Sequence, residues 1–254
     1  MSCLPGFSVV GHGPRRVMVL GGWLGVAQEW EALYPAIDLD RFTFAFPDYR
    51  GYGASRLLAG EYTFAEAADD VAAIAQALQW ERFALVGHSM GAMAMQRVYL
   101  RMPGSIERMV AVCGVPACGS RMPAERRAMF EQAAEDLRVR AGIFDASTGK
   151  RFPAAWSEGQ ARRTGALLLP RALKSYLSQW SGSGFEQELA APALPVQLVV
   201  GDNDPSLTPA LMERTWMQWY PNTRLQVLAG CGHYPMLESP LALAATLAAF
   251  LSES

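Results

Sequence analysis

"LVGHSMGAMAMQ", Leu85–Gln96, is the stretch that decides the fold. An apolar run leads directly into Gly-His-Ser-Met-Gly, and an Ala- and Met-rich segment follows without loop-forming residues. This pattern predicts a strand that turns sharply into a helix, with Ser89 at the corner between Gly87 and Gly91. Because glycine has no Cβ, the two glycines leave room for a tight, strained turn. Such a turn raises the serine hydroxyl above the edge of a sheet.

The sequence around this stretch alternates between predicted strands and predicted helices. Six β-rich runs are predicted as strands, at residues 15–22, 41–49, 82–89, 108–115, 195–202 and 224–230. Most are apolar on both faces, which favours parallel strands covered by helices on both sides. Residues 62–80 predict a helix with a capping box of Thr63 and Glu66, and residues 239–251 predict a closing helix that begins at Ser239. The pattern is typical of an α/β fold with a doubly wound, mostly parallel sheet.

The region from Ala117 to Ala190 interrupts this alternation. Residues 123–142 and 166–180 each predict one helix, and no convincing strand accompanies them. Such an insertion is most simply a helical cap over one end of the sheet, and the alternative is a surface excursion with no role. We therefore expect a single structural domain, with an α/β core at residues 1–116 and 191–254 and a helical cap at residues 117–190.

The serine at the corner needs a base, because its hydroxyl is a poor nucleophile until its proton is removed. The chain has three histidines. His12 precedes the first predicted strand and is expected at the surface, and His88 adjoins Ser89 on a turn where neighbouring side chains diverge. His233 stands in a loop directly after the last predicted strand. By elimination we predict His233 as the base, and a solvated loop histidine is the alternative.

The base in turn needs a carboxylate that fixes the orientation of the imidazole. The loop after residues 108–115 contains no acidic residue, whereas Gly-Asp-Asn-Asp-Pro at residues 201–205 contains two. Asp204 stands where the loop has left the strand. Asp202 is the alternative, although an aspartate at such a position often bonds the turn backbone instead. The chain order Ser, Asp, His is the order that a strand-turn-helix serine implies.

Acyl transfer also needs hydrogen-bond donors for the oxyanion. Met90 follows the serine and offers a backbone amide at the start of a helix. The glycines in "VLGGWLG", Gly21 and Gly22, allow a close approach of the backbone, so the amide of Trp23 is the predicted second donor. A plain tight turn is the alternative interpretation of these glycines.

Together these motifs resemble the α/β-hydrolase superfamily, in particular its small, esterase-like, lid-bearing branch. The resemblance covers nearly the whole chain and rests on five segments in family order: "LGGWLG", "FPDYRGYGAS", "LVGHSMG", "VVGDNDP" and "GHYPMLESP". It implies that Asp204 is the acid, because the family's acid usually stands in a Gly-x-x-Asp pattern. It also implies that Asp48, Arg50 and Gly51 brace the site rather than react.

The chain departs from the family pattern in one loop, and its serine argues against two branches of the family. The family usually has His-Gly where this chain has Gly21-Gly22, so this loop can differ in conformation. A serine at position 89, in place of an aspartate, argues against the dehalogenase and epoxide-hydrolase branches.

The residues and the resemblance together predict a serine hydrolase that cleaves a small or medium, apolar carboxylic ester through an acyl-enzyme. Ser89 attacks the carbonyl, His233 takes and returns the proton, and Asp204 holds the imidazolium. The amides of Trp23 and Met90 stabilise the oxyanion. Five aromatic side chains of the insertion are predicted to line an apolar pocket under the cap: Phe144, Phe152, Trp156, Tyr176 and Trp180.

Other functions stay open at this point. The same triad serves C–C bond hydrolases, lactonases and cofactor-free perhydrolases. A ligand-binding or receptor member without enzymatic activity is also compatible with the sequence, since a fold does not determine a function.

Composition narrows the classes of partner. The chain has 254 residues, is 51% hydrophobic and 18% charged, and carries a net charge of -2 without a basic run, so we expect no nucleic acid. No apolar run is long enough to span a bilayer and the first residues lack a signal-peptide pattern, so we expect a cytoplasmic protein without membrane insertion. The four cysteines lack metal-site spacing and are expected as free thiols, with one bridge as the alternative. We expect a small-molecule substrate, no cofactor and no metal.

Overall fold

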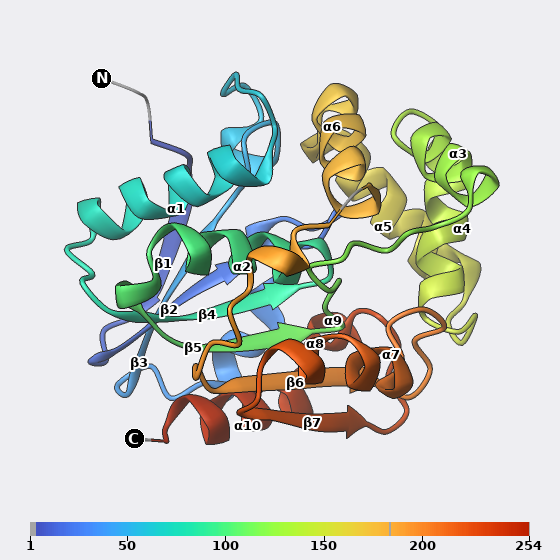
Figure 1. Cartoon of the computed structure of the whole chain (residues 1–254). Helices are drawn as coiled ribbons and strands as arrows, with labels where there is room; N and C mark the ends of the chain where they lie inside the picture. Colours follow the sequence, from blue (N-terminus) through green and yellow to red (C-terminus); the bar gives the residue numbers. More distant parts are fainter. Residues whose placement is uncertain (1–3, 183, 254) are drawn as a thin grey trace.

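The computed structural model describes residues 4–182 and 184–253, and its centre is a sheet of seven strands (Figure 1). The strand order is β1-β3-β2-β4-β5-β6-β7, and all neighbours pair in parallel except β1, which is antiparallel to β3. The strands are β1 (Phe7–Gly11), β2 (Arg15–Leu20), β3 (Phe42–Pro47), β4 (Phe83–His88), β5 (Ile106–Val112), β6 (Val196–Gly201) and β7 (Thr223–Leu228). This arrangement confirms the predicted doubly wound α/β sheet.

Helices and short 3-10 segments connect and flank the strands. The α-helices are α1 (Phe64–Ala77), α2 (Met90–Arg101), α3 (Ala124–Ala133), α4 (Leu137–Ser147), α5 (Ala154–Leu167), α6 (Pro170–Ser181), α7 (Pro209–Arg214), α8 (Trp216–Trp219), α9 (Pro235–Glu238) and α10 (Pro240–Leu251). The 3-10 segments are η1 (Ala27–Ala36), η2 (Gly53–Ser55), η3 (Pro103–Ser105) and η4 (Glu186–Glu188). Around the sheet, α1 packs against α2 and α10 packs against η1.

The central strands are buried from end to end, as their sequence predicts. Every residue of β4 and of β6 is buried. Both strands lie inside the sheet with helices above and below, and such strands carry apolar side chains on both faces. The edge strand β1 is different, because two of its five residues are exposed. The sequence prediction omits β1, since a short run without a continuous apolar face gives little strand signal.

Two predicted helix starts have the expected positions but different bonds. Thr63 caps α1 by accepting a hydrogen bond from the Glu66 amide at 3.2 Å. The Glu66 carboxylate accepts from the Tyr62 amide at 2.8 Å. In the capping box that we predicted, this bond comes from the cap residue itself. Ser239 stands at the N-cap of α10, but its side chain makes no capping bond.

The four helices α3 to α6, residues Ala124–Ser181, form a helical insertion between β5 and β6. Figure 1 shows the insertion beyond the arrowheads of the central strands, at the carboxyl edge of the sheet. The predicted helix at 123–142 is in fact two helices, because the Asp136 side chain accepts bonds from the Arg138 and Val139 amides and starts α4. The predicted helix at 166–180 is wrong at its start, since Pro170 begins α6 while α5 ends at Leu167.

The cysteines that the structure describes are unpaired, and its helices are too short or too polar to cross a membrane. Cys113, Cys118 and Cys231 are free thiols, and Cys3 lies outside the described residues. Within residues 4–182 and 184–253, no helix has the length and apolar character that crossing a membrane requires.

Candidate active site

Ser89 occupies the sharp corner between β4 and α2. Its backbone has φ 51° and ψ -116°, a conformation that costs energy for a residue with a Cβ. The corner is possible because its glycines meet backbone directly. A Cβ on Gly91 would lie 2.3 Å from the Leu20 carbonyl oxygen, and one on Gly87 would lie 2.6 Å from the Ala92 Cα. The sequence pattern therefore holds the serine at the carboxyl edge of the sheet.

Three side chains from separate loops meet at this edge. The Ser89 Oγ lies 3.0 Å from the His233 Nε2, and the His233 Nδ1 lies 2.6 Å from an Asp204 carboxylate oxygen. The ionised carboxylate can only accept, so Nδ1 donates to Asp204. Nε2 is then left as the acceptor for the serine hydroxyl. The structure thus brings the three predicted catalytic residues within hydrogen-bonding distance.

Asp204 is fixed from both sides. Its Oδ1 accepts bonds from the Ser206 and Leu207 amides at 2.9 and 3.0 Å, and its side chain is 1% exposed. Burial by itself raises the pKa of this carboxyl, but the His233 ring and the two amides outweigh it and hold the pKa at about 2. Asp202 lies elsewhere: it is exposed and accepts a bond from the Cys231 amide at 3.1 Å. The structure therefore places Asp204 at the imidazole, while Asp202 bonds the turn backbone.

His88 supports this arrangement from beneath. It is buried, and its Nε2 lies 2.8 Å from the His233 carbonyl oxygen, to which it donates. Burial is the main cause that lowers the pKa of His88 to about 3, so its ring is neutral. A neutral ring that donates from Nε2 leaves Nδ1 unprotonated. Sequence reasoning gave His88 no role, whereas the structure shows that it anchors the backbone of His233. His12 is exposed beside Asp40, as expected.

The loop that carries Trp23 is held close to the serine. A Cβ on Gly22 would lie 2.7 Å from the His88 Nδ1 and 3.4 Å from the Ser89 Cβ. The Tyr52 hydroxyl donates to the Trp23 carbonyl oxygen at 2.8 Å, and the Trp23 Nε1 donates to the Leu173 carbonyl oxygen of α6 at 2.8 Å. These bonds fix the backbone that bears the Trp23 amide.

Met90 and the "PDYRGYGAS" loop take the positions that the motifs suggest. Met90 is the first residue of α2, so its N–H is one of the amides at a helix start that lack an acceptor within the helix. Asp48 is buried and accepts from the Ala27 and Ala54 amides at 2.9 and 2.8 Å. Arg50 pairs with Asp70 at 2.8 Å. These contacts hold the loops below the serine in place.

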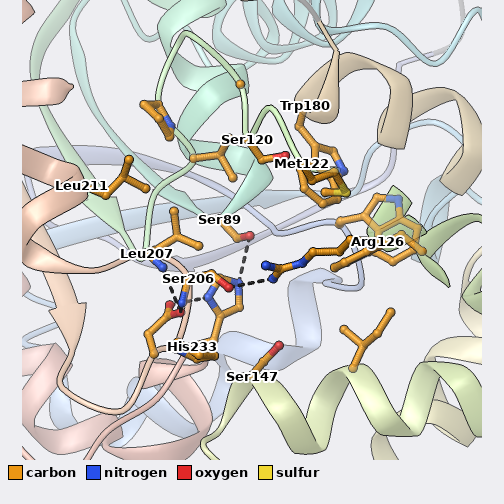
Figure 2. A pocket seen from close by; sticks show the side chains of 18 of the residues that line it. Ser89, Ser120, Met122, Arg126, Ser147, Trp180, Ser206, Leu207, Leu211 and His233 are labelled. Atoms are coloured by element: carbon orange, nitrogen blue, oxygen red, sulfur yellow. Dashed lines mark hydrogen bonds and ion pairs between the residues drawn. The ribbon is translucent and has the colours of Figure 1, made fainter. Parts of the chain in front are cut away.

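Ser89 and His233 open into a cavity of about 310 Å³ between the sheet edge and the helical insertion (Figure 2). Its wall is largely apolar, and the apolar side chains include Trp23, Phe130 and Trp180. The exposed lining residues mark where the cavity meets solvent, and they are Ser120, Arg121, Pro123, Arg126 and Pro205. A small organic molecule fits a cavity of this size and character.

Most of the aromatic residues predicted for this pocket do not line it. Trp180 does, with its ring in contact with those of Trp23 and Phe130. The other four pack elsewhere: Tyr176 against Tyr49, Tyr52 and Tyr62, Phe144 and Trp156 against Tyr234, and Phe152 against Trp156. The rings of Tyr176, Phe144 and Trp156 thus pack between the insertion and the core, where their burial removes apolar area from water.

Glu29 is a buried acid that the sequence analysis missed. It lies in η1 and is 1% exposed, and one carboxylate oxygen accepts from Arg163 of α5 at 3.0 Å. Among the residues that the structure describes, its Oε2 has no hydrogen-bond partner. Burial raises the pKa of Glu29 to about 7, although Arg163 lowers it in part. No sequence signal distinguishes this glutamate from exposed ones nearby.

Comparisons with known proteins identify the family to which the chain belongs. The sequence model of the alpha/beta hydrolase fold matches residues 15–240. A 2-hydroxymuconate semialdehyde hydrolase from Pseudomonas sp. (strain CF600) is 25% identical over 261 residues, covering 96% of this chain and 89% of that protein.

Two solved structures share the fold over nearly the whole chain. A hydrolase from Oleispira antarctica has a TM-score of 0.87 at 16% identity and covers 98% of this chain and 95% of its own. An esterase from Exiguobacterium antarcticum has a TM-score of 0.86 at 18% identity, with 97% and 95% covered. With the family match spanning most of its length, the chain belongs to the α/β-hydrolase family and is an enzyme of the hydrolase class.

Proposed function

We propose that the protein is a serine esterase that hydrolyses small or medium, apolar carboxylic esters through an acyl-enzyme. The observation that carries the proposal is the hydrogen-bonded chain from Ser89 through His233 to Asp204, at the floor of an apolar cavity. A nucleophile, a base and an orienting carboxylate in this order are the components that acyl transfer requires.

The first half of the reaction follows from the protonation states. The His233 Nε2 accepts the hydroxyl proton as Ser89 Oγ attacks the ester carbonyl. Asp204 stays ionised because its pKa is about 2, so it stabilises the imidazolium without taking the proton. The negative oxygen of the tetrahedral intermediate is stabilised by the N–H group of Met90, the residue after Ser89, and by that of Trp23, the residue after Gly22 in the loop beside it. The imidazolium then protonates the leaving alcohol, and the acyl group stays on Ser89.

The second half uses the same groups in reverse. Water donates its proton to His233 and attacks the acyl carbonyl, and collapse of the intermediate returns the proton to Ser89 as the acid leaves. The helical insertion acts as the cap, because it supplies Phe130 and Trp180 to the cavity wall. These aromatic rings favour an apolar group in the substrate.

Esters of p-nitrophenol with acyl chains from acetate to octanoate test the proposal. Wild-type protein should turn them over, and Ser89→Ala should lose at least about a thousandfold in kcat. Ser105→Ala, in η3 just after the C-terminal end of α2, is the matched serine control and should retain activity. A fluorophosphonate should add to the wild type and not to Ser89→Ala. Absence of both turnover and labelling would reject the esterase proposal.

The same panel separates the alternatives with the same triad. Lactones and a diketone cleaved at a carbon–carbon bond belong in it, since the relative from Pseudomonas is named for the hydrolysis of 2-hydroxymuconate semialdehyde. A kcat/KM at least tenfold higher for either class than for every ester would replace the ester assignment while keeping the three residues in their roles.

A further inference from the structure

One cationic side chain, Arg126, enters the cavity without a charged partner. It stands in the first turn of α3, and its guanidinium reaches across the cavity to the loop after β6 (Figure 2). There Nη2 donates to the Ser206 hydroxyl at 2.7 Å. Since a guanidinium has five N–H donors, most of its hydrogen-bonding capacity is left over.

The neighbouring arginines of the insertion have carboxylate partners. Arg121 pairs with Glu186 at 2.7 Å, and Arg127 pairs with Glu131 at 3.1 Å. Within the part of the chain that the structure describes, no carboxylate oxygen lies within 4.0 Å of the Arg126 guanidinium. Arg126 therefore differs from its neighbours in lacking a counter-charge.

The cavity itself supplies no free anion to Arg126. Asp204 is the carboxylate that lines it, and both of its oxygens are occupied, one by His233 and the other by the Ser206 and Leu207 amides. Arg126 is exposed at the mouth of the cavity, so its charge is solvated in the free protein and stays accessible to an anion. The anion that this guanidinium can bind is therefore one that enters the cavity from solvent, together with the substrate.

We propose that Arg126 binds a free carboxylate of the substrate, so that the preferred substrate is an ester that also carries an ionised carboxyl group. This inference rests on the proposed esterase function and names its substrate class. The planar guanidinium matches a carboxylate with two parallel hydrogen bonds, which gives both strength and orientation.

The side chains around Arg126 indicate the chemical character of the rest of this substrate. Phe130 follows one turn later on α3, with its ring 5.9 Å from the Arg126 guanidinium carbon. Phe130 also contacts Trp23 and Trp180, so an apolar wall extends from Arg126 toward the loop beside Ser89. An aliphatic spacer between the ester and the carboxylate would lie on this wall. Half-esters of aliphatic dicarboxylic acids have this composition.

A structural role is the competing explanation, because the bond from Arg126 to Ser206 joins the insertion to the core. The two roles predict different effects on the activity toward charged and neutral esters. Loss of a structural bond lowers the activity toward charged and neutral esters alike. Loss of a carboxylate-binding group lowers it only toward the charged ester.

The experiment compares monomethyl adipate with methyl hexanoate, a neutral ester of matched chain, by pH-stat assay. The wild type should prefer the charged ester. Arg126→Gln should lower kcat/KM for monomethyl adipate about 10- to 100-fold, chiefly through KM, and change that for methyl hexanoate less than about threefold. Arg127→Gln, the adjacent arginine on the same helix, should leave the preference intact. Ser206→Ala should also keep it, because the guanidinium remains.

Equal loss toward both esters in Arg126→Gln, or no preference in the wild type, would overturn the inference while leaving the esterase proposal standing. If neither ester is hydrolysed, the binding of adipate tests the inference instead. Adipate titrated into Ser89→Ala by calorimetry should bind, and should lose at least tenfold in affinity when Arg126→Gln is added. Unchanged or undetectable binding would overturn the inference there as well.

Discussion

Replacement of Glu29 by glutamine tests the electrostatics of the buried interface between η1 and the helical insertion. The carboxyl is buried beside Arg163, and one of its oxygens has no partner among the described residues. Glutamine has nearly the same shape and keeps an oxygen that can accept from Arg163. The substitution therefore removes the ionisation while it preserves the packing.

The size of the effect follows from the pKa of Glu29, which burial raises from 4.5 to about 7. Between these values the folded protein holds a proton that the unfolded chain has released, so the free energy of unfolding falls as the pH rises. Each pKa unit is worth about 1.4 kcal/mol, so the whole shift corresponds to about 3 kcal/mol. Most of this loss, about 2 to 3 kcal/mol, falls between pH 5 and pH 8.

Urea unfolding of the wild type and Glu29→Gln at intervals from pH 5 to pH 8 measures this difference. The variant should gain on the wild type as the pH rises, and the two curves should run parallel above pH 8. Glu107→Gln, an exposed glutamate at the start of β5, controls for the substitution itself. Parallel curves over the whole range would refute the reasoning. A wild type that gains on the variant with rising pH would show instead that pairing with Arg163 outweighs burial.

Three further outcomes are expected at the site. Asp204→Asn should lower kcat for p-nitrophenyl esters about a thousandfold or more, while Asp202→Asn should stay near wild type. The reverse result would show that Asp202 is the acid that orients the histidine. Gly22→Ala should lower kcat at least tenfold because its Cβ would lie 2.7 Å from the ring below the serine, whereas Gly21→Ala should cost less, its nearest contact being 3.4 Å. Trp180→Leu should widen the cavity and so raise kcat/KM for the octanoate ester relative to that for the acetate ester. An unchanged ratio would show that Trp180 does not select the acyl-chain length.

Much of the core could be predicted from sequence because its signals are local. A continuous apolar run predicts a buried strand, and Gly-x-Ser-x-Gly at its end predicts the corner at Ser89. The position of His233 followed from the small number of histidines. Asp204 needed the family resemblance, since two aspartates in one loop are equivalent by spacing. The geometry that separates Asp204 from Asp202 is tertiary.

The features that sequence could not supply depend on packing between distant segments. Tyr176 and Phe144 are aromatic, as many pocket residues are, but their rings pack at the interface between the insertion and the core. Arg126 is one of several arginines on the insertion, and only the fold shows that it lacks a counter-charge. Glu29 looks like an ordinary surface acid until α5 covers it. Burial of a charged side chain has no periodicity that a single sequence could reveal.

The hydrogen bond from the Trp23 indole to α6 affects which sequence changes this helix can tolerate during evolution. Its acceptor is the main-chain carbonyl of Leu173, which every amino acid possesses. Side chains of α6 can therefore drift, or be randomised in a library, without losing this tether to the loop beside the nucleophile. An insertion or deletion within α6 would move the carbonyl away and disturb that loop. Selectivity can thus evolve by point substitution on this helix, while its length stays under constraint.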